Sequence, residues 1–145
     1  MTTFSTKRAI PASPSSVFAA FQNPDRLARW WGPHGFTNTF ETFEFQPGGK
    51  WVFSMHGPDG KTYPNESMFV SIVPNSEIVI RHVCQPHFQL TITLQEHPAG
   101  TLLAWEQAFD DDSVANAIRH IVETANEQNL DRLCAEVQSD ALSAS

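Results

Sequence analysis

A chain of 145 residues with nine Lys and Arg against sixteen Asp and Glu, and thus a net charge of −7, has the size of one domain and no basic cluster. This charge excludes nucleic acid as a partner, since binding to a phosphate backbone needs a basic surface. No apolar run approaches the roughly 20 residues that cross a bilayer, and neither a signal peptide nor a transit helix precedes Pro11. We therefore expect one soluble cytoplasmic domain without membrane insertion.

The aromatic residues almost all lack a hydroxyl group. The chain has eleven Phe and four Trp but one Tyr. Such side chains bury large areas and predict a strongly apolar interior, which is either packed or lines a cavity. Cys84 and Cys134 are the two cysteines. Without a secretory context, we expect both to be reduced and structural.

Two short helices are predicted between the first and second strands. Residues 4–10 form the first strand, and Ser13-Pro14 is the start signal of a helix, with a capping residue followed by a proline in the first turn. Asn23-Pro24 repeats this signal. The second helix must end at Trp31-Gly32-Pro33, because proline restricts the residue before it and glycine lowers helix propensity.

From Thr39 onward the sequence predicts six strands in a meander. Alternating or β-branched runs are separated by short turns rich in Gly, Pro, Asn and Asp. Residues 88–95, for example, alternate apolar and polar side chains, as in a strand with one buried face. The predicted turns are Pro47-Gly48-Gly49, Gly57-Pro58-Asp59-Gly60, Pro74-Asn75-Ser76, Gln85-Pro86 and His97-Pro98-Ala99-Gly100.

One long helix is predicted after the last strand. Residues 110–112 are three aspartates, which favour a helix N-terminus because they interact well with its dipole. An apolar stripe follows, with Arg, Glu, Asn and Gln on the opposite face. Residues 139–145 are small and polar and are expected to form a flexible tail, which leaves a single domain over residues 1–138. The stripe consists of Val114, Ile118, Ile121, Val122, Ala125, Leu130, Leu133, Cys134 and Val137.

These elements predict an α+β fold. Sequential strands joined by short turns pair as neighbours, and a twisted antiparallel sheet of about seven strands curls. The curved sheet then wraps around the long C-terminal helix, and the first strand pairs with the last. The space between sheet and helix is the natural place for a ligand cavity.

The segments described so far together resemble the SRPBCC, or START-like, superfamily. Within it, the chain is similar to bacterial proteins related to the C-terminal domain of the activator of the heat-shock-protein-90 ATPase. One departure is Gln46, where members of the family often carry arginine before the Pro-Gly-Gly turn, so no role of that arginine is carried over. The resemblance is carried by RAIPASPSSVFAAF, PDRLARWWGP, FEFQPGGKWVFSMHGPDGK, VPNSEIVI, LTITLQEHPAGTLLAWEQAF and the closing helix.

This resemblance implies the helix-grip fold with a central cavity. Members of the superfamily include lipid and hormone binders, polyketide cyclases and aromatases, and resistance proteins, so the fold alone does not determine the chemistry. The leading hypothesis is therefore the binding of a small hydrophobic ligand that is aromatic, polyketide-like or lipid-like. The alternatives are an enzyme of cyclase or dehydratase type that uses the same cavity, and a chaperone-associated stress-response protein. The chain is expected to be a monomer or a homodimer.

The candidate binding residues combine apolar walls with a few polar groups. His82 and Gln107 are expected to orient the ligand, and Glu66 would suit proton transfer if it faced the cavity. Trp30 and Trp31 are expected either to roof the cavity or to fill the core beside Phe21. The predicted ligand-binding residues are Trp30, Trp51, Phe53, Met55, Glu66, His82, Phe88, Trp105, Gln107, Phe109, Ile118 and Val122.

No motif for a metal, a cofactor or a catalytic group stands out. Pro47-Gly48-Gly49 lacks the spacing and the following helix of a phosphate-binding loop, and the standard hydrolase and zinc-protease motifs are absent. His82, Cys84 and His87 lie close in sequence, but they straddle a turn and form an incomplete zinc ligand set. We therefore expect no metal and no cofactor, and assign no catalytic residue.

Overall fold

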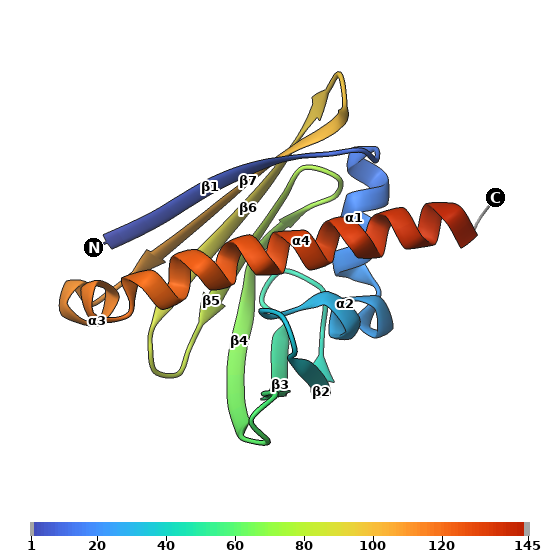
Figure 1. Ribbon diagram of the computed structural model, residues 1–145. Helices are drawn as coiled ribbons and strands as arrows, with labels where there is room; N and C mark the ends of the chain where they lie inside the picture. Colours follow the sequence, from blue (N-terminus) through green and yellow to red (C-terminus); the bar gives the residue numbers. More distant parts are fainter. Residues whose placement is uncertain (1, 144–145) are drawn as a thin grey trace.

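The computed structural model describes residues 2–143, with side chains described up to residue 139. Figure 1 shows a curved antiparallel sheet with the long helix α4 lying across it. The strands of the described chain are β1 (Thr2–Ile10), β2 (Thr37–Phe43), β3 (Lys50–His56), β4 (Thr62–Val73), β5 (Glu77–His82), β6 (Phe88–His97) and β7 (Gly100–Phe109). The helices are α1 (Pro14–Gln22), α2 (Pro24–Trp30), α3 (Asp112–Ala117) and α4 (Arg119–Ser143).

The seven strands form one sheet in the order β1-β7-β6-β5-β4-β3-β2. Each strand from β2 to β7 pairs with its neighbour in sequence, and β1 pairs antiparallel with β7. Sheet curvature is assisted by register shifts between β2 and β3 and between β4 and β5, where an extra residue bends the strand. The predicted α+β helix-grip fold of seven strands, with β1 beside β7, is confirmed.

Both short helices begin where the sequence predicts. The Ser13 side chain accepts a hydrogen bond from the backbone N–H of Ser16, and the Asn23 side chain accepts from the N–H groups of Asp25 and Arg26. A proline follows each cap in the first turn, where its missing N–H costs no hydrogen bond. The two helices therefore stand between β1 and β2, as predicted.

The prediction of one continuous helix from residue 110 is wrong in one respect, because the structure divides it into α3 and α4. Asp111 caps a separate six-residue helix, α3, which ends at Ile118, where the backbone leaves the helical region with φ −110° and ψ 12°. Within α4, most of the predicted stripe does face the protein, but Ile121 lies on the outer face and is 69% exposed. Asn129, predicted on the outer face, is instead only 6% exposed. The stripe continues across the break in sequence, so periodicity alone gives no sign of it.

The predicted flexible tail falls partly outside the described residues. Helix α4 runs to Ser143, so residues 139–143 are helical, and residues 144 and 145 lie outside the described chain. The domain boundary at residue 138 stays a prediction. None of the described helices is long and apolar enough to span a membrane.

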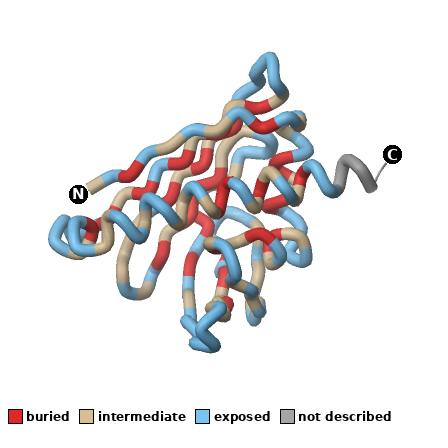
Figure 2. The backbone as a smooth tube through the Cα atoms, viewed as in Figure 1, coloured by how far each residue is buried: buried red, intermediate tan, exposed pale blue. Residues whose placement is uncertain are grey.

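The core lies between the sheet and the helices and is largely aromatic. Figure 2 shows buried and exposed positions alternating along the strands. The main cluster centres on Trp51, whose ring stacks on Phe53 at 4.3 Å and on Phe69 at 5.8 Å between centroids. A second, smaller cluster under α3 contains Phe4, Phe109 and Ala115. Burial of these large rings is the main source of stability for such a sheet.

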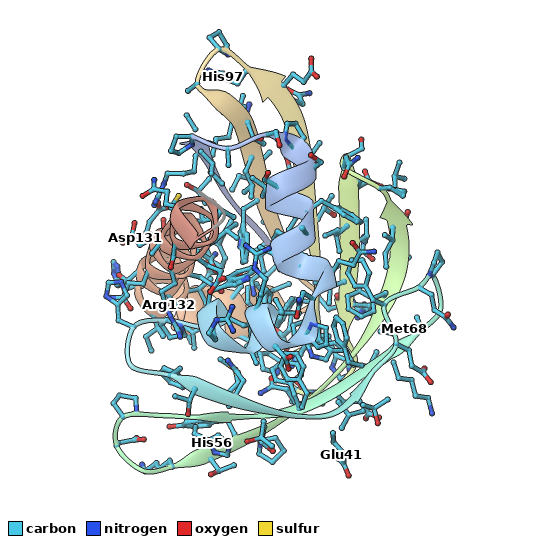
Figure 3. All side chains as sticks on the ribbon, turned by 90° about the vertical axis from the view of Figure 1, so that its right-hand side faces the viewer. Glu41, His56, Met68, His97, Asp131 and Arg132 are labelled. Carbon is cyan, nitrogen blue, oxygen red and sulfur yellow. The ribbon has the colours of Figure 1, made fainter. Side chains whose placement is uncertain are left out.

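Polar contacts fix α4 over the sheet. Glu136 bridges Arg26 at 3.1 Å and Arg29 at 3.0 Å, which ties α4 to α2. On the other side, Arg8 of β1 pairs with Asp131 at 2.8 Å. Arg132 donates to five backbone carbonyls of Arg29 and of the segment 31–36, at 2.6 to 3.1 Å. Figure 3 views α4 end-on, with Asp131 and Arg132 labelled.

Candidate functional site

A cavity of about 230 Å³ lies between the sheet, α4 and the segment that follows α2. The segment contributes Trp31, Gly32 and Pro33. Helix α2 ends at Trp30, and the extended chain that follows reaches the cavity. Apolar walls come from β3, β5, β6 and β7 and consist mainly of Phe53, Met55, Ile80, Phe88, Leu90 and Trp105. The polar side chains that line it are Asn65, Ser67, His82, Gln107, Asn126 and Asn129.

The size and lining of this cavity suit a small, largely apolar ligand. Drug-sized ligands occupy sites of about 300–1,000 Å³, so a volume of about 230 Å³ favours a molecule with one or two rings. A larger surface hollow of about 540 Å³ is lined by residues 85–87 and 109–114. Three consecutive aspartates lie on its edge, and it lacks the apolar walls that remove a ligand from water. The cavity under α4 is therefore the better candidate.

His82 forms part of the wall and is already satisfied by the protein. Its ring is 5% exposed and stacks on Phe88 at 4.5 Å between centroids. Nδ1 donates to the Pro86 carbonyl at 2.7 Å, and Nε2 lies 2.9 Å from Oδ1 of Asn65 and 3.4 Å from Sγ of Cys84. Burial lowers the pKa of His82, more than the hydrogen bond to Pro86 raises it. The lowered pKa favours the neutral ring with its proton on Nδ1, and Nε2 then accepts from the Cys84 thiol, because Oδ1 of Asn65 is itself an acceptor. Neither nitrogen is therefore free to serve as a base.

Glu66 does not reach the cavity. Its side chain is exposed, because successive residues of β4 face opposite sides and Asn65 and Ser67 take the inner positions. Glu66 is therefore not placed to move protons in the cavity, as the enzyme alternative would need. The prediction that Glu66 lines the cavity is therefore wrong, because the alternation of the strand turns this side chain to the outer face.

Six of the twelve predicted residues line the cavity, and six do not. Trp30 and Trp51 are each 1% exposed and belong to the main core, where Nε1 of Trp30 donates to the Ala20 carbonyl at 2.9 Å. The remaining three predicted residues, apart from Glu66, belong to the small cluster under α3: Phe109, Ile118 and Val122. The residues found on the cavity wall are Phe53, Met55, His82, Phe88, Trp105 and Gln107.

Sequence reasoning missed several lining residues. Of the two adjacent tryptophans, Trp31 lines the cavity, with its ring 5.8 Å from that of Trp105, while Trp30 fills the core. Asn126 and Asn129 were predicted on the outer face of the helix. Their spacing of three residues, which places two amides on one helical face, was the available signal.

Three side-chain amides meet on the α4 side of the cavity. Nδ2 of Asn126 donates to Oε1 of Gln107 at 3.1 Å, and Nδ2 of Asn129 donates to the Trp30 carbonyl at 3.2 Å. These bonds leave Nε2 of Gln107 and the Oδ1 atoms of Asn126 and Asn129 without these protein partners. Among the described residues, no group of His, Cys, Asp and Glu is arranged to hold a metal ion. His82, Cys84 and His87 thus do not form such a group.

A curved antiparallel sheet that holds a cavity against a C-terminal helix defines the helix-grip class of proteins, which typically bind hydrophobic ligands. The chain belongs to the family described as activator of Hsp90 ATPase homolog 1-like protein, whose model matches residues 11–138. This agrees with the resemblance to the SRPBCC superfamily inferred from the sequence.

Solved bacterial structures share this fold at low sequence identity. Protein CV1439 from Chromobacterium violaceum is 24% identical, with a TM-score of 0.84 over 93% of this chain and 96% of its own. Protein NE0264 from Nitrosomonas europaea is 15% identical, with a TM-score of 0.88 over 97% and 96%. The AHSA1-like protein from Aeromonas hydrophila is 17% identical, with a TM-score of 0.79 over 97% and 95%. A comparison with curated proteins gave no match.

Proposed function

We propose that the protein binds a small hydrophobic molecule, aromatic or polyketide-like rather than a long lipid, in the cavity between the sheet and α4. The observation that carries this proposal is a cavity of about 230 Å³ with aromatic and aliphatic walls and a few polar side chains. This is the composition of ligand sites, in which apolar walls supply affinity and few polar groups fix orientation. The family to which the chain belongs supports the same reading.

The enzyme alternative lacks a proton-transfer pair. The nitrogens of the neutral His82 ring are engaged by the Pro86 carbonyl and the Cys84 thiol, and Glu66 is exposed. General acid–base catalysis needs a group within hydrogen-bond reach of the ligand with a free proton or lone pair. Binding without turnover is therefore the function that this site favours. A chaperone-associated role, a cytoplasmic location and the choice between monomer and homodimer stay predictions.

A cavity-filling variant tests the proposal directly. Ala125 lines the cavity from α4, and Ala125→Leu adds apolar volume to an existing space, so it is expected to keep the fold at equal or higher stability. The exposed Ala135 on the same helix provides the matched control, Ala135→Leu. Native mass spectrometry and a thermal-shift screen of small aromatic compounds would measure binding, since a ligand of the native state raises the melting temperature.

The expected result is a shift for the natural sequence and for Ala135→Leu, and at least about a tenfold loss of affinity for Ala125→Leu, or about 1.4 kcal/mol. Equal binding by Ala125→Leu would place the ligand elsewhere and refute the proposal. The same mass spectra report the oligomeric state.

A further inference from the structure

We infer that the cavity selects an uncharged ligand, a small aromatic molecule that carries a hydroxyl or carbonyl group, and rejects carboxylates and amines of the same skeleton. This inference rests on the proposed function and narrows it to a chemical class. It depends on the charges and hydrogen-bonding groups of the lining residues.

No Asp, Glu, Lys or Arg side chain is among the described residues that line the cavity. Burial of an unpaired ion costs far more than burial of a hydrogen-bonded neutral group, and this cost falls on affinity when the site offers no counter-charge. Neutral ligand groups escape that cost. A carboxylate such as that of a fatty acid therefore finds no partner of opposite charge on the wall.

The one titratable side chain on the wall does not change this conclusion. His82 is the lining histidine, and burial lowers its pKa, so it is uncharged at pH 7. Its neighbours Arg81 and His87 also lower the pKa of His82. The wall thus has no formal charge at neutral pH.

Arg132 is the cation next to the segment that closes the cavity, and both of its Nη groups are committed to backbone carbonyls. Its Nη1 donates to the carbonyls of Trp31, Gly32 and Pro33 at 2.9 to 3.1 Å, and Nη2 donates to those of Arg29 and Phe36. An anionic ligand would have to displace these bonds to reach the guanidinium. The cation therefore holds the backbone of the segment and leaves the interior uncharged.

The wall does offer neutral donors and acceptors. Since Oε1 of Gln107 accepts from Asn126, the Nε2 group of Gln107 is left as a donor. Asn126 and Asn129 each use Nδ2 on the protein, and their Oδ1 atoms are left as acceptors. Ser67, which is 4% exposed, adds a hydroxyl that both donates and accepts. A phenol or an aryl ketone matches this set.

The test compares probes that share one naphthalene skeleton. We would measure the affinities of naphthalene, 2-naphthol, 2-acetylnaphthalene, 2-naphthoate and 2-naphthylmethylammonium at pH 7 by calorimetry or by quenching of tryptophan fluorescence. The expected order places 2-naphthol and 2-acetylnaphthalene first. The two ions are expected to bind at least about tenfold more weakly than these, since each tenfold loss corresponds to about 1.4 kcal/mol.

A variant of Gln107 adds a second readout. Gln107→Met removes the donor while keeping the length of the side chain, so affinity for 2-acetylnaphthalene is expected to fall relative to that for naphthalene. Equal or tighter binding of 2-naphthoate or the ammonium would overturn this inference and leave the proposed function standing. Failure of every probe to bind would overturn both. The comparison of probes on the natural sequence needs no variant and stands even if Gln107→Met does not fold.

Discussion

Replacement of Arg132 by methionine tests how the segment that closes the cavity is held in place. In the structure, this one guanidinium donates to five backbone carbonyls, four of which belong to residues 31–36. Those four carbonyls follow the end of α2 and lie outside any strand. Besides Arg132, the Trp31 carbonyl accepts from Nδ2 of Asn38 and the Pro33 carbonyl from the N–H of Phe36. Arg132→Met keeps the aliphatic stem and removes every donor. Burial also lowers the pKa of Arg132, which means that the charge itself is costly to bury.

The size of the effect follows from these bonds. Hydrogen bonds to a charged group contribute about 1.5–3 kcal/mol each, but carbonyls near the surface regain water when the guanidinium is removed. Counting the loss as two such bonds near the lower end of this range gives a destabilisation of about 3–4 kcal/mol. For a domain of this size, this lowers the melting temperature by about 10 °C. The same change frees the segment that carries Trp31, so the affinity for 2-naphthol is expected to fall as well.

Urea and thermal unfolding followed by circular dichroism would measure this loss. Arg119→Met is the matched control on the same helix, because Arg119 makes a single hydrogen bond to Asn116 and lies over the ring of Phe4. We expect the control to lose about 1 kcal/mol or less. If Arg132→Met lost no more stability than Arg119→Met and bound 2-naphthol unchanged, the proposed role of the guanidinium would be refuted.

Three further outcomes are expected. Trp30→Phe removes a hydrogen bond to the Ala20 carbonyl, whereas Trp105→Phe removes an N–H that is buried without a partner. Urea unfolding should therefore find Trp30→Phe less stable than Trp105→Phe by about 1 kcal/mol or more. Equal losses of stability would contradict this prediction. Because burial holds the pKa of His82 below its usual 6.5, the unfolded chain takes up this proton first, and stability should fall as pH drops below about 6.5. His82→Gln should lack this component between pH 7.5 and 5, and an unchanged pH dependence would disprove it. Hydrogen bonds from two arginines of α2 lower the pKa of Glu136 by more than burial raises it. The ionised carboxylate therefore stabilises the fold above about pH 4.5, and this contribution is lost in acid. Glu136→Gln should reduce the loss of stability in acid that unfolding curves record.

The fold was predictable because its signals are local. Each turn of the meander and each proline-led helix start is specified by a few adjacent residues, and sequential strands then have one simple way to pair. The break at Ile118 was not predictable, because apolar residues recur at helical spacing on both sides of it. The predicted stripe also fails at two positions within α4, since Ile121 is apolar but faces solvent and Asn129 is polar but buried.

The site was predictable only in part, since strand alternation gives the face of a residue and not its position along the cavity. Trp51, Phe53 and Met55 share one face of β3, yet only the last two line the cavity, while Trp51 packs in the core. Phe109 likewise shares a face with Gln107 but lies under α3. Where the cavity ends is set by the helices that close over the sheet, which no pattern within a strand records.

The pairing of β1 with β7 has a consequence for synthesis on the ribosome. Thr2 pairs with Phe109 and Ile10 with Thr101, so β1 leaves the exit tunnel long before its partner strand β7. Contacts this distant in sequence form late, because a long loop must close before they can. A growing chain can assemble the meander from β2 to β6, but its first strand stays unpaired until β7 has emerged. Helix α4, which completes the cavity, emerges later still, so ligand binding cannot assist the early steps of folding.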